Sequence, residues 1–255
     1  MNQLTIVKVG GKIVEEPESL KALLKDFSLI AGYKLLVHGG GRSATDIAQK
    51  LGLESKMVNG RRITDEEMLK VVTMVYGGLV NKNIVAQLQA LKLDAIGLTG
   101  ADLNIMLSEK RPVTDVDYGY VGDIKEINGP TLSNLIHQNY IPVLAPITHD
   151  GKGQLLNTNA DTIAGEAAKA LTFDFNVRLI YCFEKRGVLM NENDENSVIP
   201  TLDKEMFLQY KEDGIIQGGM IPKLENAFQA IAMGVKEVII TQASDINTGK
   251  GTFIR

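Results

Sequence analysis

Tryptophan is missing from this sequence, and aromatic residues make up only 5% of it. Proteins that hold single-stranded nucleic acid without sequence preference stack the bases on such side chains, so a base-stacking function is disfavoured. The formal net charge of −4 provides no basic field that would attract nucleic acid or an anionic membrane. We therefore expect small molecules as ligands, with no nucleic-acid and no membrane partner.

Cysteine and long apolar runs are also scarce. The one cysteine, Cys182, lies in the segment VRLIYCF, where we expect it to pack inside a strand; a single thiol cannot form an internal disulfide. The N-terminal segment MNQLTIVKVGGK lacks the pattern of a signal peptide. No apolar run approaches the roughly 20 residues that a membrane-spanning helix needs. These absences predict a soluble, cytoplasmic protein.

What the sequence does contain is a regular alternation of short apolar runs with longer helical patterns. The apolar runs are continuous, as in strands covered on both faces, and lie at 4–9, 34–38, 94–98, 141–146, 177–183 and 237–241. Helical patterns fall between them, near 18–31, 43–51, 65–92, 160–171 and 222–233. This order predicts an α/β fold, a three-layer αβα sandwich around a largely parallel sheet.

Two segments interrupt that alternation. Residues 104–128 are punctuated by glycines, which predicts hairpins laid on the main sheet. The dipeptide Asn59-Gly60, flanked by apolar and β-branched residues, predicts a tight hairpin. A boundary near residue 172 would divide the single domain 1–255 into an N-terminal lobe, 1–172, and a C-terminal lobe, 173–255.

Three glycine-rich turns share one plan, in which a strand is followed by the turn and then by the start of a helix. They are V-K-V-G-G-K (7–12), H-G-G-G-R-S (38–43) and G-G-M-I-P-K (218–223), where Pro222 suits the first turn of a helix. Glycines let backbone N–H groups approach an anion, and a helix N-terminus adds a favourable dipole. Each turn alone is a weak signal, but three in one chain, two of them with a lysine, indicate a phosphate site.

Other motifs that would compete with this interpretation are missing. The sequence has no G-x-x-x-x-G-K-[ST] loop and no H-R-D or D-F-G motif. Residues 39–44 match a dinucleotide-binding pattern, but no acidic residue follows at a strand end about 20 positions on. H-G-G-G resembles a lipase loop, yet the G-x-S-x-G elbow is absent. His38 has no metal-ligand spacing with the other histidines, so we expect a packed, hydrogen-bonded histidine and no metal site.

Six motifs in order resemble the amino-acid kinase family, and within it the N-acetylglutamate kinases, over essentially the whole chain. They are I-V-K-V-G-G, V-H-G-G-G, N-G-R-R-I-T-D, N-T-N-A-D-T-I-A, G-I-I-x-G-G-M-I-P-K and the closing G-T-F-I. The resemblance implies an enzyme of arginine biosynthesis that uses ATP to phosphorylate the side-chain carboxylate of N-acetyl-L-glutamate. It also implies an amino-acid site in the N-terminal lobe and an ATP site in the C-terminal lobe.

Carried over by position, the resemblance gives each matching residue a role. Lys8 and Lys223 would contact the transferring phosphoryl group, and Asp161 would lie between them and orient them. The acylated glutamate would be bound by Gly40, Gly41, Arg62 and Asn157. The nucleotide would be bound by Gly10, Gly11, Glu184, Lys185, Arg186, Gly187, Val188, Leu189, Ile215, Ile216 and Gln217. ATP implies Mg²⁺, held mainly by phosphates and water.

These residue types suit phosphorylation of a carboxylate. Such a nucleophile has a reference pKa near about 4 and is already ionised, so it needs no general base. Catalysis should rest on alignment and positive charge, because both reactants are anionic. Arg62 offers a fork for a substrate carboxylate. Two alternatives stay open: Arg61 and Arg62 could form a solvated hairpin tip, and Asn157 or Asn159 could cap a helix.

Two positions depart from the family pattern. The segment C-F-E-K-R-G (182–187) replaces a usual T-D or S-D, which bears on the ATP contacts. Arg42 stands where a proline frequently follows H-G-G-G, and its guanidinium suggests a larger or charged acyl group such as N-succinyl; a surface arginine paired with Asp46 is the alternative. Arginine-inhibited, hexameric members of the family carry an extra N-terminal helix, for which the six residues before Val7 leave no room. The resemblance therefore implies a homodimer that is insensitive to arginine. A non-catalytic sensor of amino acid and nucleotide is the alternative of a different class.

Overall fold

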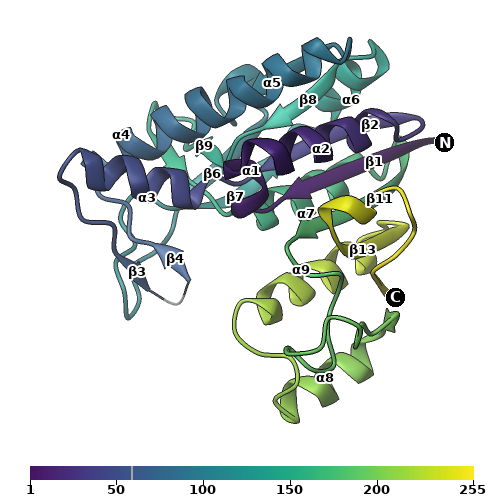
Figure 1. Cartoon of the computed structure of the whole chain (residues 1–255). Coiled ribbons are helices and arrows are strands. Elements are labelled where there is room, and N and C mark those ends of the chain that lie inside the picture. The colour runs from purple at the N-terminus through teal and green to yellow at the C-terminus, as the bar shows by residue number, and fades with distance from the viewer. Residues whose placement is uncertain (59) are drawn as a thin grey trace.

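The central sheet takes its strands from both halves of the chain. The computed structural model describes residues 1–58 and 60–255. Eight strands are ordered β12-β14-β13-β11-β1-β2-β8-β5 (Figure 1). They are β1 (Asn2–Val9), β2 (Tyr33–His38), β5 (Ala95–Leu98), β8 (Ile141–Leu144), β11 (Phe175–Phe183), β12 (Thr201–Leu202), β13 (Glu237–Gln242) and β14 (Thr252–Ile254). The β13–β14 pair is antiparallel and the other pairs are parallel, which confirms the prediction.

Helices cover both faces of this sheet, because alternate residues of each strand are apolar on either side. Ile6 packs on one face with α6 (Gly129–His137), α7 (Ala160–Leu171), α8 (Lys204–Glu212) and α9 (Met220–Ala232). Val7 packs on the other with α1 (Gly11–Glu15), α2 (Pro17–Ser28), α3 (Gly41–Lys50), α4 (Glu66–Val72) and α5 (Asn81–Ala90). The three-layer αβα sandwich is therefore confirmed.

A smaller sheet and a short hairpin account for the irregular segments. The strands β6 (Met106–Lys110), β7 (Gly122–Ile127), β9 (Ile147–His149) and β10 (Leu155–Asn157) form a sheet in the order β10-β9-β6-β7, and β6 and β7 make the hairpin predicted within 104–128. The strands β3 (Met57–Val58) and β4 (Arg61–Arg62) pair antiparallel. Of the predicted Asn59-Gly60 turn, Asn59 lies outside the described residues.

Some elements differ from the expectation. The helix predicted over 65–92 contains a π-helical stretch, Thr73–Val80, between α4 and α5. The helix α6, which begins at Gly129-Pro130 with Asn128 as its N-cap, was not predicted. The strand predicted before the third glycine turn is wrong, because the helix α8 precedes that turn. Short 3₁₀ turns occur at Asp102–Asn104 and Ala243–Asp245. Within the two described ranges, every helix is too short or too polar to cross a lipid bilayer. The predicted lobe boundary near 172 falls where α7 ends and remains a prediction.

Candidate active site

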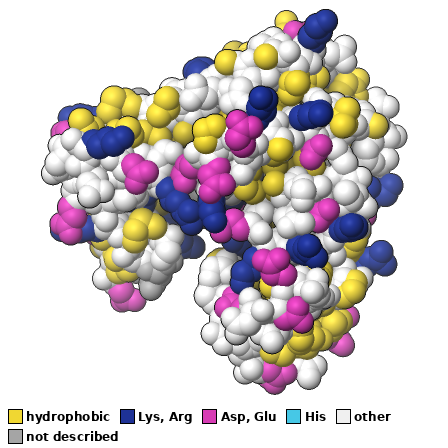
Figure 2. All heavy atoms as spheres, viewed as in Figure 1, with side chains coloured by type: hydrophobic (Ala, Val, Ile, Leu, Met, Phe, Trp, Pro, Cys, Tyr) yellow, Lys and Arg dark blue, Asp and Glu magenta, His cyan; other side chains and the backbone are white. Residues whose placement is uncertain are grey.

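Two cavities meet at Lys8. The first, of about 210 Å³, is lined by the glycine turn 39–41, the β3–β4 hairpin and residues 157–161. The second, of about 300 Å³, is lined by Gly10 and Lys12 at the start of α1, by residues 183–185, and by Met220 and Lys223 of α9. Lys8 lines both. Figure 2 shows the hollow between the β3–β4 hairpin and the α8–α9 region, with lysine and arginine side chains gathered around it.

Asp161 joins Lys8 to Lys223. The Nζ of Lys8 lies 2.6 Å from Oδ1 of Asp161, and the Nζ of Lys223 donates to Oδ2 at 2.7 Å. Lys8 comes from the middle strand β1, whereas Lys223 lies near the start of α9 and its ammonium group is 5.0 Å from the Phe183 ring centroid. The structure thus brings together the three residues that the sequence suggested as a phosphoryl clamp, here called the inner cluster.

The start of α7 fixes the position of Asp161. Asn159 is the N-cap of this helix, and its side-chain oxygen accepts hydrogen bonds from the backbone N–H groups of Asp161 and Thr162. An acidic side chain in the first turn is favoured by the helix dipole. The capping alternative considered for these asparagines is therefore correct for Asn159. Asn157 instead donates to the Thr64 hydroxyl at 3.0 Å.

Burial and charge together set the ionisation of the inner cluster. Burial alone would raise the pKa of Asp161, but the ammonium groups of Lys8 and Lys223 outweigh it and lower that pKa to about 2. Burial lowers the pKa of Lys8, and the Asp161 carboxylate opposes this shift. Asp161 is consequently an anion at neutral pH, and it gives the buried Lys8 and the partly exposed Lys223 a partner of opposite charge.

The glycine turn after β2 is shaped by close packing. A Cβ added at Gly40 would lie 3.0 Å from the ring of Tyr76, which the π-helical stretch carries into the first cavity. His38, directly before the turn, is buried; its Nδ1 is 2.7 Å from the Gly39 carbonyl and its Nε2 is 3.1 Å from the Asn81 amide. Burial lowers its pKa to about 4, so it is a neutral packed histidine, as predicted.

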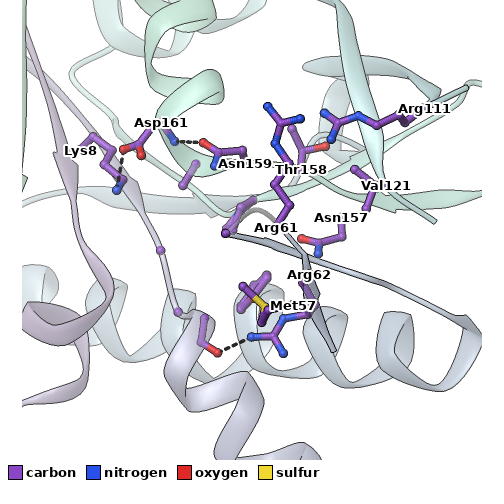
Figure 3. Close-up of a pocket in the computed structure, with 17 residues that line it drawn as sticks. Lys8, Met57, Arg61, Arg62, Arg111, Val121, Asn157, Thr158, Asn159 and Asp161 are labelled. Carbon is purple, nitrogen blue, oxygen red and sulfur yellow. Dashed lines mark hydrogen bonds and ion pairs between the residues drawn. The ribbon is translucent and has the colours of Figure 1, made fainter. Parts of the chain in front are cut away.

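Arg62 is held beside this turn and, among residues 1–58 and 60–255, has no acidic side chain within 4.0 Å of its guanidinium. Its side chain donates to the Gly41 carbonyl at 2.7 Å, to the Thr45 hydroxyl at 2.9 Å and to the Ser55 hydroxyl. Arg62 is only 7% exposed, so the solvated-tip alternative is wrong for it, whereas Arg61 is exposed. Both line the first cavity (Figure 3). A buried guanidinium with neutral acceptors alone retains a positive charge that an anionic ligand can balance.

Most of the residues assigned to the nucleotide line the second cavity or a small pocket beside it. Gly10, Glu184 and Lys185 line the second cavity, while Lys185, residues 187–189 and residues 215–217 line a small pocket next to it. Gly187 has a packing role as well, since a Cβ there would lie 2.8 Å from Thr252 Oγ1. Arg186 is exposed, and its guanidinium donates to the Asn196 side chain. Gly11 begins α1.

Glu184 forms a second cluster, here called the outer cluster. Its carboxylate lies 3.7 Å from Lys12 Nζ and 3.6 Å from Arg42 Nη2. Arg42 therefore pairs with Glu184 and not with Asp46, the partner considered in the surface-arginine alternative. It lines neither cavity. The suggestion that Arg42 contacts the acyl group thus has no support in its position.

Several lining residues have no signal in the sequence. Tyr76 reaches the glycine turn only through the π-helical stretch, and Arg111 joins the cavity through the β6–β7 hairpin. Thr158 and Lys12 adjoin predicted site residues but had been given no role. Cys182 is buried in β11, as expected, and burial raises its pKa to about 12.

A magnesium ion fits this site only as a companion of phosphate groups. Among the described residues, no group of three or more His, Cys, Asp and Glu side chains could hold a metal. Asp161 is committed to two lysines, and Glu184 is the carboxylate that lines the second cavity. Four lysines, Lys8, Lys12, Lys185 and Lys223, face that cavity, a donor set that suits polyphosphate.

The comparisons with known proteins agree with this geometry. The sequence profile of the amino acid kinase family matches residues 3–242. The acetylglutamate kinase of Parabacteroides distasonis is 70% identical over 254 residues, which cover 100% of each chain. Among solved structures, smu.665 from Streptococcus mutans superposes with a TM-score of 0.83 at 26% identity and 98% coverage of both chains. Carbamate kinase from Giardia lamblia, bound to AMP-PNP, shares the fold with a TM-score of 0.71 at 14% identity, covering 98% of this chain and 97% of that one.

The chain belongs to the amino acid kinase family. It is a kinase, and a relative that matches it over its full length is an acetylglutamate kinase.

Proposed function

We propose that this protein transfers the γ-phosphoryl group of ATP to the side-chain carboxylate of N-acetyl-L-glutamate, forming N-acetyl-L-glutamyl 5-phosphate in arginine biosynthesis. The observation that carries the proposal is the place of Lys8 at the junction of two cavities, paired with Asp161. The 70% identity to an acetylglutamate kinase over the whole chain supports it.

The first cavity suits the acceptor. Its glycine turn offers the backbone N–H groups of Gly40 and Gly41 to the reacting carboxylate, next to Lys8. Arg62 would bind the α-carboxylate, because it is buried and holds only neutral acceptors. Asn157 would contribute its side-chain amide from the end of β10. Such contacts align the nucleophile with the phosphorus atom, which is the main requirement of phosphoryl transfer.

The second cavity suits the phosphoryl donor. Lys8 and Lys223 would hold oxygens of the transferring group, and residues 184–189 and 215–217 would bind the rest of the nucleotide. A carboxylate oxygen forms the new bond to phosphorus while the bond to the β-phosphate oxygen breaks, and ADP leaves with that electron pair. No proton has to move, since the nucleophile is already ionised. Mg²⁺ would neutralise phosphate charge and be held mainly by phosphates and water.

Asp161 acts as a positioning residue in this scheme. Its two oxygens hold both lysine nitrogens within 2.7 Å of the carboxylate, so the two side chains converge before any substrate binds. Fixed donors of this kind, aimed at charge that develops in the transition state, contribute about 10²–10³ in rate each.

Product trapping tests the proposal directly. The protein with ATP, Mg²⁺ and N-acetyl-L-glutamate should release ADP, and hydroxylamine should convert the acyl phosphate to a hydroxamate. Unacylated L-glutamate should react at least about tenfold more slowly, since the acyl arm contributes binding energy. Nucleotide and amino-acid binding without hydroxamate would contradict the proposal and favour the non-catalytic sensor.

The homodimer, its insensitivity to arginine and the cytoplasmic location stay predictions from the sequence. Sedimentation equilibrium tests the first, and a hexamer would contradict it. Activity measured with and without arginine tests the second.

A further inference from the structure

The helix α1 links two glycine turns, here called the donor turn (residues 10–11) and the acceptor turn (residues 39–41). It begins within the donor turn and ends at Glu15. Glu15 Oε1 accepts a hydrogen bond from the backbone N–H of Ser43, with the two atoms 2.7 Å apart. Ser43 lies in the first turn of α3, which starts at the end of the acceptor turn. The residue that closes one helix is therefore bonded to the start of the other.

The N-terminus of α3 needs an acceptor from outside the helix. The first four N–H groups of an α-helix have no partner within it. The N-cap of α3 is Gly40, which has no side chain to accept a hydrogen bond, and the first turn of α3 has no acidic residue. Glu15 supplies a carboxylate from α1 instead, and the helix dipole favours a negative charge there. This bond uses neither of the Gly40 and Gly41 N–H groups, which the proposed function needs for the acceptor.

Pairing with a cation does not explain Glu15. Within the described part of the chain, no lysine, arginine or histidine nitrogen lies within 4.0 Å of its carboxylate. The side chain is partly buried and lines neither cavity. Its charge is still felt at the first cavity: burial raises the pKa of Tyr76, the Arg62 guanidinium opposes this shift and the Glu15 carboxylate adds to it. Glu15 can thus act on the site only through the residues that it holds.

Two other contacts join the same segments, and both differ from the bond of Glu15. The Gly39 N–H donates to the Val9 carbonyl at 3.1 Å, which joins the two turns where their strands end. The outer cluster connects α1 to α3 through Lys12 and Arg42, but its pairs are half exposed and 3.7 and 3.6 Å long. A carboxylate bonded to a backbone N–H is a shorter and stronger contact. The bond of Glu15 is therefore the contact that sets the spacing between the two helix starts.

We propose that Glu15 is a positioning residue that keeps the acceptor turn aligned with the donor turn. Phosphoryl transfer depends on the alignment of the nucleophile with the phosphorus atom, and a displacement of about 1 Å can cost about 10² in rate. The Gly10 N–H donates to the Cys182 carbonyl of β11 at 3.0 Å, which anchors the donor turn to the central sheet. Through Glu15, the helix that starts at this anchor determines where α3 begins. The inference rests on the proposed function and adds to it a residue that touches neither reactant.

Variants of Glu15 separate this role from that of a helix cap that only adds stability. In Glu15→Ala we expect kcat to fall by about tenfold to a hundredfold in the ADP-release assay, because the two turns are no longer held together. The Kd for ATP alone and the Kd for N-acetyl-L-glutamate alone, measured by calorimetry, should each change by less than about threefold, since each turn by itself is intact. Glu15→Gln should keep kcat within about threefold, because its amide oxygen can still accept from the Ser43 N–H.

Asp203→Ala is the matched control. Asp203 accepts from the Met206 N–H at 2.8 Å in the first turn of its own helix, α8, so it makes the same kind of bond but joins no two turns, and it lines neither cavity. This variant should lose stability in urea, as Glu15→Ala does, and keep its kcat.

Three results overturn the inference and leave the proposed function standing. They are a kcat in Glu15→Ala within about threefold of that of the unaltered protein, a loss of kcat as large in Asp203→Ala, and a Glu15→Gln variant as slow as Glu15→Ala. If the unaltered protein releases no ADP with the acceptor, the proposed function fails and this inference fails with it.

Discussion

The inner and outer clusters have the same arrangement of charges but differ greatly in exposure to solvent. Each places one carboxylate between two cations: Asp161 between Lys8 and Lys223, and Glu184 between Lys12 and Arg42. In the inner cluster the distances are 2.6 and 2.7 Å, and the Lys8 and Asp161 side chains are 7% and 10% exposed. In the outer cluster the distances are 3.7 and 3.6 Å, and the three side chains are 45–62% exposed.

This difference shows which charges need a protein partner in the folded state and which can be stabilised by water instead. A buried ion pair has lost its hydration, so removing one partner leaves a charge without compensation. An exposed pair exchanges its partner for water at little cost. Both clusters border the second cavity, so the contrast separates residues fixed before binding from residues free to adapt to a nucleotide.

Replacing Asp161 should have the largest effect. Asp161→Asn leaves the buried ammonium group of Lys8 facing the partly exposed one of Lys223 without a carboxylate between them, and we expect the free energy of unfolding to fall by about 3–5 kcal/mol. ADP release should fall by about 10²-fold or more, because the lysines are no longer held together. Urea unfolding and the hydroxamate assay measure the two effects. The double variant Lys8→Met/Asp161→Asn should recover part of the stability and none of the activity; a double variant no more stable than Asp161→Asn would contradict the proposed pairing.

Two of the four lysines of the second cavity, Lys223 and Lys12, should affect different kinetic constants when they are replaced. Lys223→Met should lower kcat by about 10²–10³, because Lys223 is the partner of Asp161 and meets the transferring group. Lys12→Met should raise the KM for ATP by less than about tenfold and leave kcat within about threefold. The reason is that the Lys12 side chain is half exposed and pairs with Glu184, not with Asp161. Steady-state kinetics at saturating acceptor measure both. Equal losses of kcat in the two variants would contradict the prediction that only the inner cluster contributes to the chemical step.

Part of the pH dependence of stability on the acid side should come from Asp161 of the inner cluster. The folded-state pKa of Asp161 is about 2, below its ordinary value of 3.8, so its ionised form stabilises the fold above pH 4 and that stabilisation is lost as the pH falls through 2. Between pH 5 and pH 3 the loss should be about 1 kcal/mol. Urea unfolding at these two pH values, compared between the unaltered protein and Asp161→Asn, isolates this contribution. An identical pH dependence in both proteins would be the contrary result.

What could be predicted from the sequence depends on whether neighbouring or distant residues give a side chain its place. Lys8 and Lys223 were predictable because each adjoins a glycine turn, and the sheet was predictable because its strands are continuous apolar runs. The place of Arg111 in the lining of the first cavity was not predictable, since a hairpin brings it to residues far away in the chain. Tyr76 reaches Gly40 through a π-helical stretch that has no residue signature. Arg42 was misjudged because its side chain turns to Glu184, a contact between distant segments.

Replacing Glu184 should have the smallest effect. Glu184→Gln removes the carboxylate of the outer cluster, and we expect the free energy of unfolding to change by less than about 0.5 kcal/mol, because half-exposed pairs at 3.6–3.7 Å are solvated and screened. Any difference at low salt should shrink further in about 0.5 M NaCl, where the screening length is only a few ångströms. Urea unfolding at the two salt concentrations measures this. A loss as large as that of Asp161→Asn would mean that Glu184 also holds the fold together, and that burial is not what separates the two clusters.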